Sequence, residues 1–349
     1  MFLRNYWYVA ALDDEVRDRP LGRTILGEPV VLFRTADGAL HAFEDRCPHR
    51  RLPLSMGKIV GDVLQCHYHG LRFDGSGQCA RVPGQDHIPQ NARVRTFPVI
   101  ERYRWIWIWM GDPALADPAQ ICDFHWLTDP QWGAKPSYLH VEANWQLVVD
   151  NLLDLTHLAF VHETTIGNMA LVEHAAVKVQ RAPNNVLVTR WIVDQPAPPT
   201  FVKVGKFTTN VDRWQIIDYT PPAFLRLDVG ACPTGTGAPD GRRVGGIGMR
   251  NLNAITPETE TTAHYFWAQA HDFEPHNAEM TDRVFEQIKT AFLEDVAVFT
   301  AQQRSISLRP DALQVDINAD AGGMQARRIV DRLYREEQVA ATAHATAAE

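Results

Sequence analysis

Two short segments, RCPHR at residues 46–50 and QCHYHG at residues 65–70, each combine a cysteine with histidine. Together they supply four candidate metal ligands with the spacing C-x-H-x16-C-x2-H: Cys47, His49, Cys66 and His69. A common zinc finger takes two cysteines from one loop and two histidines from a later helix, whereas here each loop mixes the two residue types. A 2Fe-2S cluster with two thiolates on one iron and two imidazoles on the other needs such mixed loops. The spacing therefore favours an iron-sulfur cluster, with a structural zinc site as the alternative.

The composition limits the class of protein. With 349 residues, 45% of them hydrophobic, the chain is long enough for two domains with buried cores. Its net charge of -8 and its lack of a basic stripe argue against a nucleic-acid partner. The sequence has neither a signal-peptide core nor an apolar run that could span a membrane, so we expect a cytoplasmic protein with no membrane partner. In that reducing compartment, cysteines outside the two segments are expected to be free thiols: Cys79, Cys122 and Cys232.

Hydrophobic periodicity divides the chain near residues 112–120. Before this point the pattern is that of strands, as in RWIWIWMGDP at 104–113, where tryptophans alternate with isoleucine and methionine. After it, NWQLVVDNLLDLTHLAFVHE at 144–163 favours a helix, and strand-like runs return over 176–270. Two later helices are predicted at about 278–304 and about 323–337. The expected division is residues 1–115, residues 116–340 and a disordered, alanine-rich tail at 341–349.

The predicted helix at 144–163 carries a second group of candidate ligands. Asn151, Asp154 and His157 follow one another at intervals of three, which places them in one broad stripe of a helix. His162 lies five residues beyond His157, about 140° around an ideal helix. Both imidazoles can reach one metal only if the helix ends or distorts between them, and we predict that interruption. A lone histidine is usually an ordinary core or surface residue, but this pair beside an acid favours a metal site.

An oxygen-activating ferrous site commonly adds one carboxylate to two histidines. Asp295 occupies a core-facing position in the apolar stripe of the helix predicted at about 278–304. A buried, unpaired carboxylate destabilises a fold by several kcal/mol unless a cation compensates it, which makes Asp295 the predicted third ligand. Glu294 is expected to face solvent, and Glu163 is a weaker candidate because it directly follows His162.

Both groups of residues resemble those of Rieske oxygenases. CPHR at 47–50 and CHYHGLRFDGSGQC at 66–79 are similar to the cluster loops of that family, and the D-x2-H-x4-H pattern from Asp154 to His162 is similar to its mononuclear iron motif. NYWYVAAL at 5–12 and NADAGGMQARRIVDRL at 318–333 most resemble the oxygenase component of vanillate O-demethylases, and nearly as much those of dicamba O-demethylases and methyl-hydroxylating sulfonate oxygenases. The implied fold class is α+β. An N-terminal all-β Rieske domain would precede a helix-grip (START-like) catalytic domain with a curved antiparallel sheet and long C-terminal helices.

The resemblance assigns roles to the candidate residues. The 2Fe-2S cluster would bind to Cys47, His49, Cys66 and His69, and a mononuclear Fe(II) to His157, His162 and Asp295. Asp154 would carry electrons between subunits by joining a cluster histidine of a neighbouring chain to its own His157, with Asn151 beside it. This implies a homotrimer or a multiple of it. In the alternative, Asp154 only orients His157.

The same resemblance implies the reaction. The chain would use O2 to hydroxylate a methyl or methoxy carbon, O-demethylating a methoxylated aromatic acid such as vanillate with release of formaldehyde. No dinucleotide-binding motif is present, so electrons from NAD(P)H would come through a separate ferredoxin-type reductase. Asn253 is a candidate for binding the substrate carboxylate, although it could equally be a polar residue at a strand end. Arg250 could supply a cation, although exposed arginines are more common.

Two other functions remain open. One is a ring-hydroxylating dioxygenase, or a methyl hydroxylase acting on another aromatic acid, with the same metals. The other is a non-catalytic protein that joins a Rieske electron carrier to a ligand-binding sheet.

The iron content distinguishes an enzyme from a non-catalytic carrier. An oxygenase should contain about three irons per chain, two in the cluster and one at the triad. About two irons per chain, measured on the purified protein, would mean that the triad binds none.

Overall fold

The computed structural model describes residues 1–163, 166–167, 169–173 and 175–347. The chain forms two compact units, one of residues 2–121 with 256–260, and one of residues 122–255 with 261 onward. Among the described helices, none combines the length and the apolar character needed to cross a membrane.

The first unit is built of short strands, as the periodicity predicts. Its described strands form three sheets: β1 (Trp7–Leu12), β11 (Trp105–Trp109) and β10 (Val99–Arg102); β2 (Leu21–Ile25), β3 (Glu28–Arg34), β4 (Leu40–Glu44) and β9 (Thr96–Phe97); and β5 (Lys58–Val60), β6 (Val63–Gln65), β7 (Arg72–Phe73) and β8 (Cys79–Arg81). Single 3-10 turns occur at η1 (Leu54–Met56), η2 (Pro113–Leu115) and η3 (Pro118–Gln120). The alternating tryptophan strand is β11, and both of its faces are buried.

A hairpin turn far along the chain completes this unit. Residues 256–260 comprise the last two residues of β17 (Ile247–Pro257), a strand of the large sheet of the second unit, and the turn after it, but they pack with residues 2–121. The backbone N–H of Leu26 donates to the carbonyl of Pro257 at 2.9 Å, and that of Gly27 donates to the carbonyl of Glu258 at 2.8 Å. The buried hydroxyl of Thr256 donates to the carbonyl of Val9 at 2.7 Å. The first unit therefore contains chain from two separate regions of the sequence.

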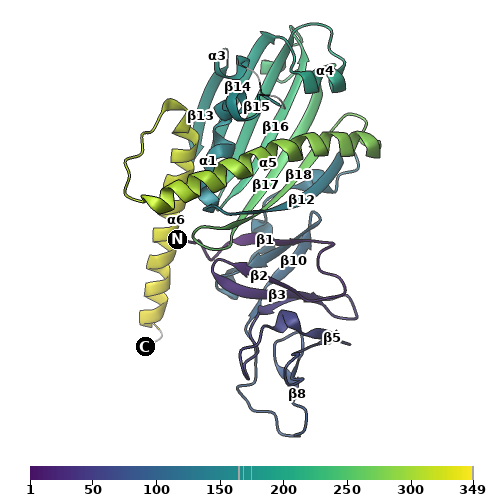
Figure 1. Ribbon diagram of the computed structural model, residues 1–349, viewed down its shortest axis with the longest axis vertical. Coiled ribbons are helices and arrows are strands. Elements are labelled where there is room, and N and C mark those ends of the chain that lie inside the picture. The colour runs from purple at the N-terminus through teal and green to yellow at the C-terminus, as the bar shows by residue number, and fades with distance from the viewer. Residues whose placement is uncertain (164–165, 168, 174, 348–349) are drawn as a thin grey trace. The chain divides into compact units, whose positions relative to one another are not determined.

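One large sheet forms the centre of the second unit (Figure 1). The order of its described strands is β12 (Gly133–Val141), β18 (Ala263–His271), β17 (Ile247–Pro257), β16 (Phe224–Pro233), β15 (Val211–Thr220), β14 (Asn185–Gln195) and β13 (Ala176–Ala182). Antiparallel pairing joins β12 to β18 and joins each strand from β13 to β17 to the next. Because side chains alternate along a strand, every second residue of β15 to β18 points to the helix side of the sheet.

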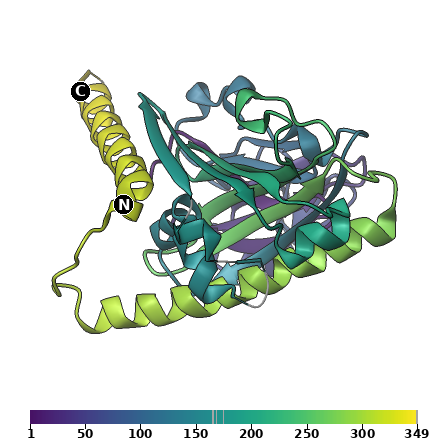
Figure 2. The same cartoon turned by 90° about the horizontal axis from the view of Figure 1, so that it is seen from above.

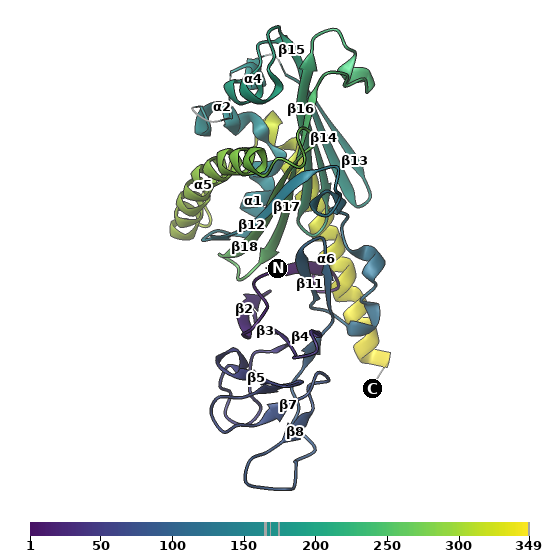
Figure 3. The ribbon, with the colours of Figure 1, turned by 90° about the vertical axis from the view of Figure 1, so that its right-hand side faces the viewer.

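Helices cover that side of the sheet. The helical segments of the second unit are η4 (His125–Leu127), α1 (Trp145–Leu153), η5 (Leu155–His157), α2 (Leu158–Val161), α3 (Ala170–Glu173), α4 (Pro199–Gly205), η6 (Ala238–Asp240), α5 (Ala278–Leu308), η7 (Asn318–Asp320) and α6 (Ala321–Ala347). The long helix α5 crosses the face of the sheet (Figure 2), and α1, α2 and α4 lie on the same side as α5 (Figure 3). The expected α+β class, with an antiparallel sheet and long C-terminal helices, is confirmed.

Aromatic stacking fixes α5 on the sheet. The ring of Trp267 in β18 is stacked on Phe285 at 4.9 Å and meets Phe292 edge-on at 4.8 Å. Trp267 is fully buried, and burial of such large side chains contributes several kcal/mol to folding. Since Asp295 follows Phe292 by less than one helical turn, this contact also sets the position of the Asp295 carboxylate.

Two details differ from the sequence expectations. The helix at 144–163 ends already at Leu153, because Asp154 adopts an extended conformation and its side chain accepts a hydrogen bond from the N–H of Thr156. Helix α6 continues through 341–347, where a disordered tail was expected, and the high helix propensity of the many alanines there explains the extension. Residues 348–349 of that expected tail lie outside the described residues.

Candidate functional site

The two cysteine-histidine segments form loops of the same shape. The N–H of Arg51 donates to the carbonyl of Cys47 at 2.9 Å, and the N–H of Gly70 donates to the carbonyl of Cys66 at 3.2 Å. Arg51 and Gly70, each four residues after its cysteine, both have positive φ, 60° and 75°. Glycine adopts this conformation freely, whereas Arg51 does so at some cost. Each loop turns back on itself and places its histidine near its cysteine.

The four predicted ligands are arranged in two layers. Cys47 and Cys66 are buried, whereas His49 and His69 are exposed, with ring centroids 4.4 Å apart. Burial, with a smaller contribution from Cys66, raises the pKa of the Cys47 thiol to about 11, although backbone N–H groups of His49 and Arg50 oppose the shift. Such thiols need a bound cation to become thiolates at neutral pH. Two inner sulfurs and two outer imidazoles suit a Rieske cluster, whose two irons have different ligands.

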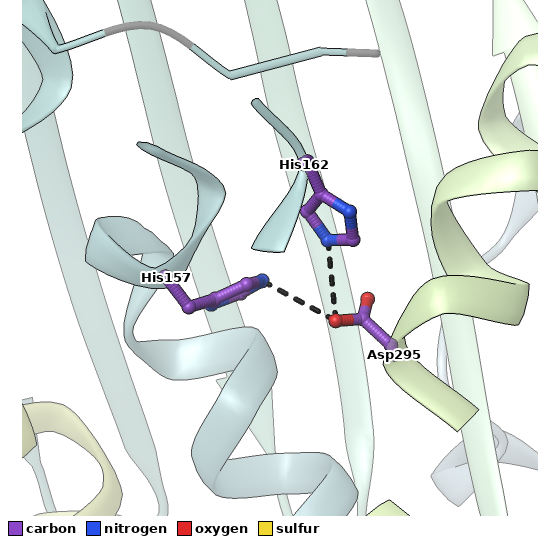
Figure 4. A group of neighbouring side chains, drawn as sticks. All are labelled: His157, His162 and Asp295. Carbon is purple, nitrogen blue, oxygen red and sulfur yellow. Dashed lines mark ion pairs between the residues drawn. The ribbon is translucent and has the colours of Figure 1, made fainter. Parts of the chain in front are cut away.

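The second group of predicted ligands also comes together. His157 ends η5, His162 directly follows α2, and Asp295 lies on α5, so three separate elements supply the triad (Figure 4). The Nε2 atoms of the two histidines lie 3.6 Å and 3.1 Å from Oδ1 of Asp295. One ligand atom from each residue lies within 4.8 Å of the others. The helix ends at Val161, before His162, which confirms the predicted interruption between the two histidines.

The main-chain carbonyl of Asp154 fixes the protonation of His157. Nδ1 of His157 lies 2.6 Å from that carbonyl oxygen, which can only accept a hydrogen bond. Nδ1 therefore carries the proton, and Nε2 directs its lone pair toward Asp295. Burial lowers the pKa of His157, against the opposing charge of Asp295, which favours the neutral imidazole that a metal binds.

Glu294 holds the other histidine. Its Oε2 lies 2.6 Å from Nδ1 of His162, so the expectation that Glu294 faces solvent is wrong. The reason is that His162 approaches α5 from the side, where the longer glutamate side chain reaches its ring while Asp295 faces the opposite nitrogen. Burial would lower the pKa of His162, but hydrogen bonds to and the charges of Asp295 and Glu294 together raise it.

The triad has the donor set of a ferrous site. Two imidazole nitrogens and a carboxylate oxygen converge, and Asn151 holds the carboxylate through a hydrogen bond from Nδ2 to Oδ1 of Asp295 at 3.2 Å. Asp295 is only 4% exposed, and a buried carboxylate beside two imidazoles is stabilised by a cation, which a bound metal or a protonated imidazole can supply. The residues therefore fit a divalent metal ion, and two histidines with one carboxylate are typical of iron that activates O2.

The Asp154 carboxylate has a different role from its carbonyl. Its oxygens accept hydrogen bonds from the N–H of Thr156 at 2.9 Å and from the Thr156 hydroxyl at 2.8 Å. Nη2 of buried Arg190 lies 3.7 Å from the same carboxylate. The link from Asp154 to His157 thus runs through the main chain, while the carboxylate caps η5 and faces an arginine.

A cavity lies between α5 and the sheet, and the triad forms part of its wall. Among the described residues, α1, η5, α4, α5 and β15 to β18 all contribute to the lining. Most of this wall is apolar, for example Leu155, Leu227, Met249, Ile288 and Phe292. An apolar cavity with a few polar groups and a metal-binding triad is a typical small-molecule site.

The predicted substrate residue Asn253 does not line this cavity. It is 0% exposed, and its amide N–H groups donate to Leu225 and Asn251 while its Oδ1 accepts from the hydroxyl of Tyr265. Asn251, two residues earlier on the same face of β17, lines the cavity instead. Arg250 points to the other face of the strand, where it pairs with Asp228.

Two cavity residues escaped the sequence analysis. Arg213 and Gln215 lie on β15 and face the cavity, and both are buried. The available signal was their register, since they share one face of the strand with apolar Val211 and Ile217. Polar residues in an apolar register are uncommon in a sheet that only forms a core.

Comparison with known proteins agrees with both metal sites. Residues 6–98 match the Rieske [2Fe-2S] domain, and residues 141–336 match the vanillate O-demethylase oxygenase C-terminal domain. The toluene-4-sulfonate monooxygenase system iron-sulfur subunit of Comamonas testosteroni is 45% identical, over 97% of this chain and 98% of that protein. A vanillate O-demethylase oxygenase subunit of Pseudomonas sp. (strain HR199 / DSM 7063) is 36% identical over 98% of each chain. Dicamba monooxygenase bound to dicamba matches with a TM-score of 0.87 at 36% identity, over 97% of this chain and 99% of that one.

The contact of Glu294 with His162 predicts a specific loss of iron. In Glu294→Gln the charged acceptor for Nδ1 disappears, and metal affinity at the triad should fall about 10- to 100-fold. Iron content after dialysis against a chelator should drop selectively at the triad, while cluster absorbance stays unchanged. Glu286→Gln is the matched control, because Glu286 lies on the same helix but pairs at the surface with Lys289. Equal iron retention in the two variants would contradict this role of Glu294.

Proposed function

The chain belongs to the Rieske non-haem iron oxygenases with a vanillate O-demethylase oxygenase C-terminal domain, and we propose that it hydroxylates a methyl or methoxy carbon of a small aromatic acid. The observation that carries this proposal is the triad of His157, His162 and Asp295, which opens into an apolar cavity. A C–H bond held in that cavity would lie next to this group of metal-binding side chains.

The metals would supply the redox chemistry. When bound, the mononuclear iron would activate O2 with single electrons delivered by the Rieske cluster. Members of this family are oxygenase components of multicomponent systems, so a reductase or ferredoxin supplies the electrons. We propose a ferredoxin-type reductase, which would take them from NAD(P)H.

The substituent that is hydroxylated decides the product. Hydroxylation of a methoxy carbon gives a hemiacetal, which collapses to a phenol and formaldehyde, as expected for a substrate such as vanillate. Hydroxylation of an aryl methyl carbon gives a stable benzylic alcohol. The 45% identical relative is a toluene-4-sulfonate monooxygenase subunit, which supports the second product as strongly as the vanillate relative supports the first.

The residues of this chain position the reactants. Apolar side chains such as Leu155 and Phe292 exclude water from the triad, and Asn151 holds the Asp295 carboxylate in place. The Asp154 carbonyl and the Glu294 carboxylate keep both Nε2 atoms directed at one point. This fixed geometry reduces the reorganisation that metal binding and substrate entry require.

We also propose that the two metal centres lie in different regions of the chain and that electrons pass between neighbouring chains. Residues 1–115 would carry the cluster and residues 116–340 the iron, with Asp154 joining a cluster histidine of a neighbouring chain to His157. Exposed His69 and the partly exposed Asp154 carboxylate support such a contact, which would require a homotrimer or a multiple of it.

Product stoichiometry tests the proposed reaction. The purified protein is supplied with a surrogate reductase and NADH, and O2 uptake and formaldehyde are measured with vanillate, syringate, a methoxybenzoate and toluene-4-sulfonate. O-demethylation should release one formaldehyde for each O2 consumed, whereas methyl hydroxylation should give an alcohol without formaldehyde. A cis-dihydrodiol product would contradict both and identify a ring-hydroxylating dioxygenase.

Asp154→Asn tests the electron route. The variant keeps the main-chain carbonyl that orients His157, so both metals should remain bound while turnover falls by most of its value. Iron content and O2-coupled product formation are compared with Asp240→Asn, which changes an exposed aspartate outside the site. Full activity of Asp154→Asn would contradict the bridging role.

A further inference from the structure

Arg213 is a buried cation in the cavity wall. It lies on β15, is 5% exposed and lines the same cavity as the triad. Its Nε and Nη1 atoms are enclosed and make no hydrogen bond with any residue that the structure describes. A guanidinium in this state has lost its hydration without gaining an anion in return.

The surroundings of Arg213 do not balance its charge. The guanidinium lies 5.0 Å from the ring of Phe201, and the residue contributes to a wall that includes Met249. Burial lowers its pKa to about 10, and the like charge of Arg190 adds to this, so the side chain remains cationic at neutral pH. Asp212, the adjacent acid, instead accepts hydrogen bonds from the N–H groups of Asp194 and Gly235.

Other arginines on this sheet show the contrast. Arg226 pairs with Asp218, and Arg243 pairs with Asp228 at 2.9 Å. Arg190, on the strand next to β15, has the Asp154 carboxylate at 3.7 Å. Among the described residues that line the cavity, Arg213 is the only arginine or lysine, and it has no acidic side chain as a partner.

A second unpaired polar group lies beside it. Gln215, two residues along on the same face of β15, is 1% exposed, and its Oε1 makes no hydrogen bond within the described part of the chain. Native interiors seldom leave such groups unpaired, and two on one cavity wall indicate that a ligand completes their hydrogen bonds.

We propose that Arg213 binds the anionic group of the substrate, an aromatic sulfonate or carboxylate, and thereby directs the opposite end of the ring to the iron triad. This inference rests on the proposed function in taking the ligand to be an aromatic substrate. A guanidinium offers parallel N–H donors that match two oxygens of either anion. The apolar wall between Arg213 and the triad suits an aromatic ring. Arg213 is therefore a specificity-determining residue, which selects anions over neutral aromatics of the same shape.

Equilibrium binding tests this assignment without turnover. Anaerobic calorimetry on the iron-loaded protein, with no reductase present, measures the Kd of toluene-4-sulfonate, vanillate and the neutral 4-methylbenzyl alcohol. In Arg213→Met, affinity for the anions should fall about 10- to 100-fold, while affinity for the neutral alcohol stays unchanged. Arg213→Lys keeps the charge but loses the paired donors, so its affinity for the anions should lie between that of the native protein and that of Arg213→Met. The anion with the larger loss in Arg213→Met is the group that the site recognises.

Stability supplies a second measurement. An unpaired buried charge destabilises the ligand-free fold, so Arg213→Met should melt at a higher temperature than the native protein, whereas loss of a purely structural arginine would lower it. Arg242→Met, at a largely exposed position in the same unit, should leave both binding and melting unchanged.

The outcomes separate this inference from the proposed reaction. Unchanged anion affinity in Arg213→Met, or a native protein that binds neither anion, would overturn the role of Arg213 even if hydroxylation is observed. Anion binding that depends on Arg213, without any O2-coupled product, would uphold the anion site and reject the proposed reaction.

Discussion

The need to balance the buried negative charge of Asp295 constrains how the helical segments around it are arranged in the second unit. The buried carboxylate faces two imidazole nitrogens, an arrangement that a positive charge at this point stabilises. Two of the surrounding elements are held in place separately: α5 by the stacking of Trp267 on Phe285, and η5 by the Asp154 side chain that caps it. The fold thus supplies three ligands from segments far apart in the sequence without requiring one continuous helix.

Local patterns predicted the elements better than the contacts between them. The strand-rich first region, the two late helices and the residues of both metal sites followed from spacing and periodicity. Glu294 was assigned to solvent because a helical wheel treats a helix as isolated, whereas His162 approaches from another segment. The resemblance to a related demethylase indicates Asn253 as a substrate residue, whereas the asparagine that lines the cavity is Asn251, two residues earlier on the same face of β17. Neither position can be assigned from the sequence, since both depend on packing between distant segments.

The two histidines of the triad are chemically different despite their symmetric appearance. His157 is supported by a neutral carbonyl, and His162 by a carboxylate that draws on its proton and makes its ring the more basic ligand. The cavity beyond them has a similar asymmetry, with an apolar wall near the triad and a cation on β15. A ligand with one charged end and one apolar end would therefore have a single favourable orientation.

The hairpin turn at 256–260 has a consequence for biosynthesis. The N–H groups of Leu26 and Gly27 find their carbonyl partners only in this turn, and the Val9 carbonyl accepts from Thr256 there. Domains generally fold in the order in which the ribosome releases them, but these bonds cannot form until most of the second unit has been synthesised. A nascent chain that ends before residue 256 would therefore present an incomplete first unit with exposed backbone groups, so this unit is expected to be completed only after residue 260 has left the ribosome.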